Sequence, residues 1–520
     1  GENSLSAMVL AGLIAYALIV VLMTLLYRLP GFLACIALAG QVAATLAFVS
    51  GYFPVFESFT LTLPGIAGII LAIGMGVDAN VITAERIKEE LNNGKSLDGA
   101  LKSGFARGLT PIIDGNVTIV IVAIVLMGAF GPSDGLFAKA LHFVFFAFGP
   151  STAGTIYAFG YTLLTGVLLN FVFGVFATRV MIRGAASIKA LRNPWLYGAV
   201  KPGKEVKEKK PIDFVGLRKR FLTISTCLMA AIILCAAVFG VRLDTEFTGG
   251  AMLTLSYQGE ISTSEVQKTA STALENNGLT LQTGENVATG EQTLKISMPG
   301  NETVTTDQVE NLLTSLNEQY PDNAFAQLSL SNVSAAMGTK FLQKSLVAVV
   351  FSLLLILLYI GFRFKKIGGL TGGLMAVLAL LNDLMVVFGT FVLLCTPLDG
   401  NFIAAMLTIL GYSINDTVVV YDRIRENRAL MGKKTPFEEL VNHSVNQSAR
   451  RTIITTVTTV MALGVMCVVS KLYGLDSIFT FAFPLMMGML SGVYTSLCVS
   501  TSAWVLWNDR KSKKAETKKV

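Results

Sequence analysis

Four aspartates lie inside long apolar runs of this 520-residue chain: Asp78, Asp114, Asp383 and Asp416. A carboxylate in hydrocarbon is costly unless it is neutralised or paired, so an acid inside a membrane span indicates a functional site. Asp78 and Asp416 are the strongest candidates for an ion relay, because both lie several residues inside their runs and have Asn or Thr nearby. Asp114 lies nearer the end of its run. Asp383 follows Asn382, and a polar contact between helices would also explain it.

Arg451 is the candidate partner for these acids, since it begins a run rich in hydroxyl groups. A second acid nearby favours the protonated form of a carboxyl group, whereas an arginine nearby favours the ionised form. Thr452, Thr455 and Thr459 share one face of the predicted helix and could assist the relay. Two simpler explanations stay open. The threonines could hold helices together, and Arg451 could anchor its helix in the headgroup region.

The composition indicates a membrane protein: 53% of the residues are apolar, 14% are charged, and the mean hydropathy is +0.62. The formal net charge of +7 comes mostly from short loops and the C-terminal tail, which is typical of cytoplasmic loops and not of nucleic-acid binding. Two histidines and six scattered cysteines without CxxC spacing predict no metal site. HExxH motifs, phosphate-binding glycine loops and nucleophile–base pairs are also missing from the sequence, so we expect neither an enzyme nor a cofactor.

A membrane-spanning helix needs about 20 mostly apolar residues. The chain contains eleven candidates, at 7–27, 31–50, 61–84, 110–130, 155–178, 220–241, 341–362, 367–395, 403–421, 452–470 and 476–507. Most Lys and Arg residues lie in alternate loops, at 85–108, 179–219, 363–366 and 422–451. This pattern predicts a cytoplasmic C-terminus and an extracytoplasmic residue 1. Because an outside start without an initiator Met or signal peptide is hard to insert, we expect at least one earlier helix to be missing.

Two loops are unusual. Residues 242–338 are polar, with strand-like runs at 252–257, 293–297 and 324–330 and helix-like runs that begin at Thr263 and Thr306. This order predicts a small α+β domain of roughly a hundred residues outside the cell. The insert 131–154 is aromatic and contains His142; we expect an interfacial or re-entrant helix there, without an assigned chemistry.

The chain contains an internal repeat, because residues 74–90 align with 411–427. The alignment pairs Gly74 with Gly411, Arg86-Ile87 with Arg423-Ile424, and Glu89 with Glu426 at a constant offset. Corresponding helices run in the same direction, so the predicted fold is an all-α polytopic bundle of about eleven helices in two pseudo-symmetric halves, with one small α+β domain. Asp78 and Asp416 fall one register apart in the two copies. We therefore expect them to meet where the halves meet.

These motifs resemble the SecDF protein-export family of the resistance-nodulation-division superfamily. Residues 63–82 resemble the fourth transmembrane helix of SecD, and residues 411–427 resemble the signature helix of SecF. Segments 113–118, 247–250 and 447–452 agree with the same family. The resemblance covers nearly the whole chain. It divides the chain into a SecD-like half at 1–182, a basic cytoplasmic linker at 183–219, and a SecF-like half at 220–520 that contains the 242–338 domain.

The resemblance implies an auxiliary subunit of the Sec translocase in the bacterial plasma membrane. Such a protein uses the proton or sodium motive force to promote translocation and release of preproteins. The implied partners are the Sec channel and its motor, unfolded preproteins and membrane lipids, without nucleic acid. The relay residues carried over by motif are Asp78, Asp416 and Arg451, while Glu246 and Asn382 replace the Asp and His usual in the family.

A full-length fused relative has twelve helices and two extracytoplasmic domains, so the resemblance also implies that the first helix and first large domain are absent here. Two other functions remain possible from the sequence. One is an ion-coupled exporter of lipids or small hydrophobic molecules of the same superfamily. The other is a scaffold for the translocase, in which the intramembrane acids would be dispensable.

Overall fold

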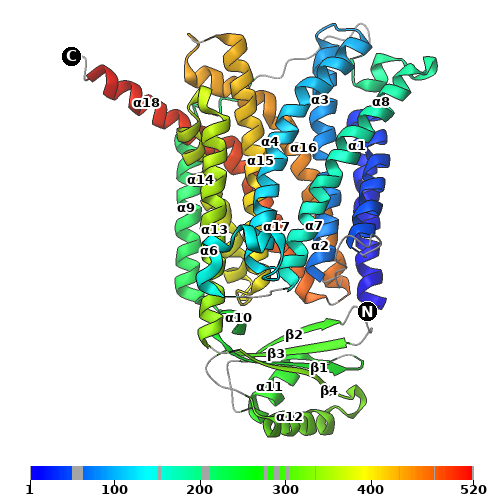
Figure 1. Ribbon diagram of the computed structural model, residues 1–520, viewed down its shortest axis with the longest axis vertical. Coiled ribbons are helices and arrows are strands. Elements are labelled where there is room, and N and C mark those ends of the chain that lie inside the picture. Colours follow the sequence, from blue (N-terminus) through cyan, green and yellow to red (C-terminus); the bar gives the residue numbers. More distant parts are fainter. Residues whose placement is uncertain are drawn as a thin grey trace.

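The computed structural model describes residues 2–49, 63–149, 154–200, 211–259, 261–274, 279–285, 292–299, 304–333, 335–432, 434–473 and 475–517. It consists of a helical bundle with a small mixed domain below one end (Figure 1). The N-terminus lies at the end that carries this domain, and the C-terminal helix projects from the opposite end. The predicted loop 51–60 and residues 201–210 of the predicted linker lie outside the described residues.

The first helical segment, α1 (Glu2–Val49), is a hairpin of two spans. Its 48 residues would extend about 70 Å as one straight helix, more than twice the thickness of the hydrocarbon core. The helix is interrupted at Arg28, whose φ of 54° is non-helical, and Pro30 follows. The Tyr16 hydroxyl donates to the Cys35 carbonyl at 2.8 Å, although 19 residues separate them. The chain therefore reverses here, as the predicted spans 7–27 and 31–50 require.

The other spans of the first half follow the prediction but extend further. They are α2 (Leu63–Gly76) with α3 (Asp78–Asn92), α4 (Leu97–Phe130), and α7 (Gly154–Asn170) continued by a π-helical stretch (Phe171–Ala177) and α8 (Thr178–Ser187). The predicted span 61–84 is broken at Val77. Between α4 and α7 lie two short helices, α5 (Leu136–Ala140) and α6 (His142–Phe145), in which Phe143 is exposed.

The second half repeats this arrangement after α9 (Arg218–Phe239). Its spans are α13 (Ala335–Arg363), α14 (Gly369–Leu393), α15 (Gly400–Met431), α16 (Phe437–Leu472), and α17 (Asp476–Tyr494) continued by a π-helical stretch (Thr495–Ser500) and α18 (Thr501–Thr517). Among the described residues, ten segments are long and apolar enough to cross a membrane. Because α1 is a hairpin, they account for the eleven predicted crossings.

The mixed domain contains a four-stranded antiparallel sheet in the order β2-β3-β1-β4. Its elements are α10 (Thr245–Thr248), β1 (Gly250–Tyr257), α11 (Thr263–Ala273), β2 (Thr280–Glu285), β3 (Gln292–Pro299), α12 (Thr306–Gln319) and β4 (Ala326–Val333). On the central strand, Leu253 lies opposite Ile296 and Leu330. Helices α11 and α12 cover one face of the sheet (Figure 1) and bury Val266 and Leu312 against it. The predicted α+β domain is confirmed, but β2 was not predicted, because this edge strand has only one large apolar side chain.

Gly74 and Gly411, which the repeat aligns, lie where helices of the two halves pack against each other. At Gly74, a Cβ would lie 2.9 Å from Thr459 Cα of α16, and the Thr458 hydroxyl donates to the Gly74 carbonyl at 3.3 Å. At Gly411, the Thr118 hydroxyl of α4 donates to the glycine carbonyl at 3.4 Å. Each copy of the repeat thus packs against a helix of the other half. This contact places the following residues, which include Asp78 and Asp416, at the interface.

Candidate functional site

Asp78 occupies a break in the middle of a span. Helix α2 ends at Gly76, Val77 forms a turn, and Asp78 is the first residue of α3. The break places Asp78 in the first turn of α3, where a helix N-terminus presents N–H groups that α2 does not bond. Asp416, by contrast, lies in the interior of the continuous helix α15.

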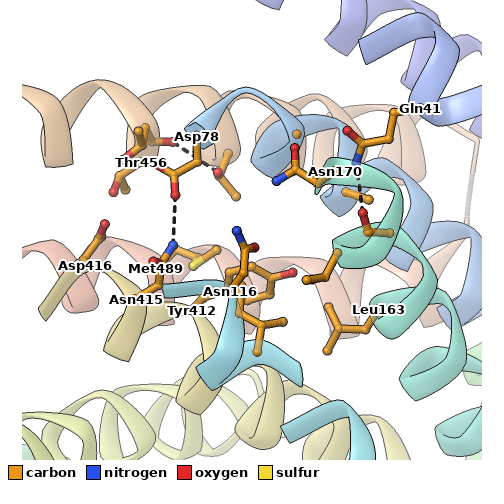
Figure 2. Close-up of a pocket in the computed structure, with 17 residues that line it drawn as sticks. Gln41, Asp78, Asn116, Leu163, Asn170, Tyr412, Asn415, Asp416, Thr456 and Met489 are labelled. Atoms are coloured by element: carbon orange, nitrogen blue, oxygen red, sulfur yellow. Dashed lines mark hydrogen bonds between the residues drawn. The ribbon is translucent and has the colours of Figure 1, made fainter. Parts of the chain in front are cut away.

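Asp78 and Asp416 line the same cavity, which has a volume of about 50 Å³ (Figure 2). A cavity needs roughly 10–15 Å³ to hold one water molecule, so this cavity can contain water or a small cation. Its other polar lining residues are Gln41, Asn116, Asn170, Tyr412, Asn415, Thr455, Thr456 and Thr459. The predicted meeting of the two acids at the interface between the halves agrees with this geometry.

Asn415 links the two copies of the repeat directly. It stands 337 residues after Asp78, the same offset that separates Gly74 from Gly411, and its side-chain amide donates to Asp78 Oδ2 at 2.9 Å (Figure 2). Space for Asn415 depends on Gly115 of α4, because a Cβ at that position would lie 1.7 Å from Asn415 Oδ1. Equivalent positions of the two halves therefore meet at this hydrogen bond.

Arg451 is buried beside Asp78 but binds it only loosely. Arg451 is 9% exposed, and its Nη2 lies 3.9 Å from Asp78 Oδ1. Within the described part of the chain, Arg451 Nε and Nη2 and Asp78 Oδ1 are all buried without a hydrogen-bond partner. Unsatisfied buried charges are expensive, so this arrangement favours a bound ion, a proton or a movement that would complete the pairing. A snorkelling anchor would instead leave its guanidinium exposed.

A second cavity of about 550 Å³ lies toward the end of the bundle opposite the soluble domain. It is lined by Arg451 together with charged residues of α3 and α15, among them Arg86, Glu89 and Arg423. None of the described residues that line it also lines the smaller cavity around Asp78 and Asp416. Arg451 thus stands between the two acids and the larger cavity.

The predicted threonine face is only partly directed at this site. Thr455 and Thr459 line the smaller cavity, but their hydroxyls donate to carbonyls of their own helix, at 3.1 Å to Thr452 O and 3.1 Å to Thr455 O. The hydroxyl of Thr452 is buried without a partner among the described residues, and Thr452 does not line the cavity. Thr455 and Thr459 therefore contribute to the wall of the cavity more than to a continuous chain of donors.

The structure separates Asp114 from the site. Its Oδ1 accepts from Arg363 Nε at 2.7 Å and from the Tyr359 hydroxyl at 3.2 Å, both on α13. This ion pair fastens α4 to α13 and lies outside the smaller cavity. Sequence patterns could not predict this pairing, because 249 residues separate Asp114 from Arg363.

Asp383 lies in a cage of hydroxyl groups. It is fully buried, and it accepts from the hydroxyls of Ser413 at 2.5 Å, Ser491 at 2.5 Å and Thr495 at 2.8 Å. The neighbouring Asn382 accepts from Ser225 at 2.6 Å, which adds α9 to the contact. Asp383 therefore joins α14 to α15 and α17. The interpretation of this acid as a contact between helices fits the geometry better than a place in the relay.

Sequence reasoning missed several amide and phenol side chains of the site, notably Asn415, Asn116 and Tyr412. A search for carboxylates alone overlooks them, although amides inside apolar runs carry a similar signal. Among the described residues, no group of three or more His, Cys, Asp or Glu side chains could hold a metal ion. The six cysteines are all free, and Cys35, Cys467 and Cys498 are buried.

Comparison with known proteins identifies the family. The family described as protein export membrane protein SecD/SecF, C-terminal, matches residues 1–158 and 312–510. The protein translocase subunit SecDF of Bacillus subtilis is 31% identical over 99% of this chain and 66% of its own length. SecDF of Brucella abortus is 28% identical over 96% of this chain and 60% of its own length. This chain belongs to the SecD/SecF family of multi-pass membrane proteins.

The fold agrees with solved structures of the same family. A crystal structure of SecDF from Thermus thermophilus, described as a translocon-associated membrane protein, superimposes with a TM-score of 0.78 at 27% identity, over 98% of this chain and 63% of that one. A structure of SecDF in a super-membrane-facing form gives a TM-score of 0.72 over the whole chain and 64% of that one. The chain spans somewhat less than two thirds of the length of these SecDF relatives.

Proposed function

We propose that this protein is an auxiliary subunit of the Sec translocase that uses an ion gradient across the plasma membrane to promote preprotein export. The curated relatives are named protein translocase subunits, which supports the general role. The observation that carries the ion-coupled mechanism is the loose, buried contact between Arg451 and Asp78, beside the cavity that Asp416 shares. Its partners would be the Sec channel and its motor, unfolded preproteins and the surrounding lipids.

The proposed cycle depends on competition for Asp78 and Asp416. A proton or sodium ion that enters the smaller cavity neutralises a carboxylate and weakens the attraction of Arg451 for Asp78. Arg451 then moves relative to the cavity, and the ion leaves through the larger cavity. Because Asp78, Asp416 and Arg451 lie on α3, α15 and α16, the change in pairing alters the packing of the two halves.

The energy available is sufficient for such a change. One charge that crosses the membrane potential releases about 2.3 kcal/mol per 100 mV. A reversal of two conformations from 1:99 to 99:1 requires roughly 5.5 kcal/mol. A concentration gradient adds to the electrical term, so one or two ions per cycle can drive a movement of the soluble domain.

The loop charges support an orientation in which the soluble domain is extracytoplasmic and the C-terminus is cytoplasmic. Thiol labelling tests this in intact cells whose outer layers admit the reagent. A cysteine replacing Ser4, or Ser315 on α12, should react with an impermeant reagent, whereas one replacing Glu205 of the basic linker should not. Labelling at 205 alone would overturn the orientation.

The relay is tested by replacing the acids with amides, which keep the shape and remove the titration. We expect Asp78→Asn and Asp416→Asn to abolish gradient-dependent export of a secretory protein into inverted membrane vesicles, with unchanged levels of the protein in the membrane. The matched control is Asp98→Asn, because Asp98 is an exposed acid paired with Arg192. Near-normal export by both relay variants would leave the scaffold function, and loss of lipid transport with intact export would favour an exporter.

A further inference from the structure

Four charged side chains form a closed ring at the end of the bundle opposite the soluble domain. Arg86 and Glu89 lie on α3, and Arg423 and Glu426 lie on α15. Between the halves, Arg86 contacts Glu426 at 2.6 Å and Arg423 contacts Glu89 at 2.7 Å. Within each helix, Arg86 contacts Glu89 at 3.3 Å and Arg423 contacts Glu426 at 2.9 Å. Each arginine therefore binds both glutamates.

The ring is built from equivalent residues of the internal repeat. Arg86 aligns with Arg423 and Glu89 with Glu426, so the two contacts between the halves are the same contact made twice, as in a twofold-symmetric interface. The arginine side chains are only 12% and 11% exposed. Water therefore screens these pairs less than it screens pairs on an open surface.

The ring lies on the route from the relay to this end of the bundle. Arg86 follows Asp78 by eight residues, and Arg423 follows Asp416 by seven, which places both about 10–12 Å further along their helices. Arg86, Glu89 and Arg423 line the larger cavity, and Arg451 lines it too. An ion released past Arg451 enters a space that the ring helps to enclose.

Gln447 connects the ring to Arg451. Its side-chain oxygen accepts from Arg423 Nε at 2.6 Å. Gln447 and Arg451 are four residues apart on α16, so they lie on the same face, one turn from each other. A movement of α16 that shifts Arg451 relative to Asp78 therefore also moves the residue that holds Arg423.

We propose that the ring of Arg86, Glu89, Arg423 and Glu426 is the gate at the cytoplasmic end of the ion path. This inference rests on the proposed function. The two contacts between the halves hold the gate closed while Arg451 is beside Asp78, and they separate when the ion leaves toward the cytoplasm. The contacts within each helix keep the charges paired while the gate is open, so opening does not leave a half-buried charge alone.

The repeat permits a test in which the composition and total charge stay constant. Exchanging the charges within one half, as Arg86→Glu with Glu89→Arg, preserves the pair within α3 but places like charges opposite each other at both contacts between the halves. The exchange Arg423→Glu with Glu426→Arg does the same from the other side. Combining all four substitutions restores opposite charges at every contact. Only a function that depends on the contacts between the halves should be lost in each single-half exchange and recovered in the fourfold variant.

We expect each single-half exchange to raise the passive leak of the coupling ion into sealed vesicles about fivefold to tenfold, which is the size of effect expected for directly interacting charges. Gradient-dependent export should fall by a similar factor. The fourfold variant should recover most of both activities. The control is the same exchange at an exposed pair, Asp98→Arg with Arg192→Asp, which should leave leak and export unchanged.

A crosslink gives a second measurement that does not depend on charge. With Arg86→Cys and Glu426→Cys, a short reversible crosslinker should stop gradient-dependent export, and reduction should restore it. The relay variant Asp78→Asn separates the two hypotheses. If Asp78→Asn and Asp416→Asn both leave export unaffected, the proposed function fails. If Asp78→Asn abolishes export but the single-half exchanges leak no more than the parent protein, or the fourfold variant leaks as much as they do, the gate alone is wrong.

Discussion

Two carboxylates inside the membrane spans of this protein have opposite surroundings. Asp383 receives hydrogen bonds from hydroxyls of α15 and α17, and the neighbouring Asn382 is also bonded. Among the described residues, Asp78 receives one hydrogen bond, from Asn415, and its second oxygen faces Arg451 at 3.9 Å beside a cavity. A fully satisfied buried network holds one arrangement rigidly, whereas a partly satisfied one can change partners. The contrast separates an acid that joins helices from an acid that can exchange an ion.

The largest effect expected from this comparison is at Arg451. Lysine retains the positive charge but lacks the planar fork that can contact a carboxylate in two geometries. We expect Arg451→Lys to lose most of the gradient-dependent export, about tenfold or more, at an unchanged membrane level. Arg450→Lys is the control, because Arg450 is largely exposed and pairs with Glu85 at 3.4 Å. Equal export by the two variants would return Arg451 to a role as an anchor.

Substitution of Asp383 should lower the stability of the protein and not its export activity. Asp383→Ala removes the acceptor of three hydroxyls, two of them buried, and each buried group left unsatisfied costs about 1–3 kcal/mol. We expect a lower thermal transition of the purified protein, by several degrees, and less protein in the membrane. Export per remaining molecule should stay close to that of the parent. A stable variant without gradient-dependent export would place Asp383 in the relay after all.

A smaller effect is expected at Gly115, where a Cβ would collide with Asn415 Oδ1. Gly115→Ala should displace the amide that bonds Asp78 and lower gradient-dependent export roughly threefold to tenfold, the effect of one hydrogen bond of about 1 kcal/mol. The control is Gly464→Ala on α16, where the nearest atom to a new Cβ is Met486 Sδ at 3.9 Å. Normal export by Gly115→Ala would show that the bond between Asn415 and Asp78 is dispensable.

The smallest effect concerns pH at the junction between the soluble domain and the bundle. Burial, together with the nearby Glu246 and Asp244, raises the pKa of Asp399 to about 7, and the pKa of Glu246 is also raised by burial. Lys295 of β3 faces this cluster of acids: its Nζ lies 3.9 Å from Asp244 Oδ2 and 4.0 Å from Glu246 Oε1. Glu246 accepts from the Gly400 N–H at 2.9 Å, at the start of α15. The junction thus links the soluble domain to the helix that carries Asp416.

The direction in which pH changes the folding stability follows from proton binding by Asp399. Between the usual pKa of an aspartate, about 4, and about 7, folded Asp399 holds a proton that the unfolded chain has lost, so stability falls as the pH rises through this window. We expect the protection factors of the amides of residues 243–250, in which each exchange rate is divided into that of an unfolded peptide at the same pH, to be lower at pH 8 than at pH 5. Asp399→Asn, which can still cap α15, should remove most of this difference, whereas Asp322→Asn at an exposed site should retain it. An unchanged pH profile in Asp399→Asn would contradict the assignment.

Several features of this protein follow from the sequence alone, because the bilayer imposes simple rules. Apolar runs of about 20 residues must cross the membrane as helices, so the spans and the polar 242–338 domain could be predicted before the structure. An ionisable side chain within such a run is rare, which identified Asp78, Asp416 and Arg451 as candidates. The aligned residues of the repeat also indicated that the two acids would meet.

Only the tertiary structure decided what each acid contacts. Asp383 and Asp78 look alike in sequence, since each lies in an apolar run with an asparagine nearby, yet the hydroxyls that satisfy Asp383 come from residues 30 to 112 positions away. Asp114 finds Arg363 across 249 residues, and Asp78 finds Asn415 across 337. Hydropathy specifies which segments enter the membrane but not which faces of the helices meet. Those faces are chosen by close packing at small residues such as Gly74 and Gly411, and this packing determines which polar groups are satisfied and which remain free to exchange partners.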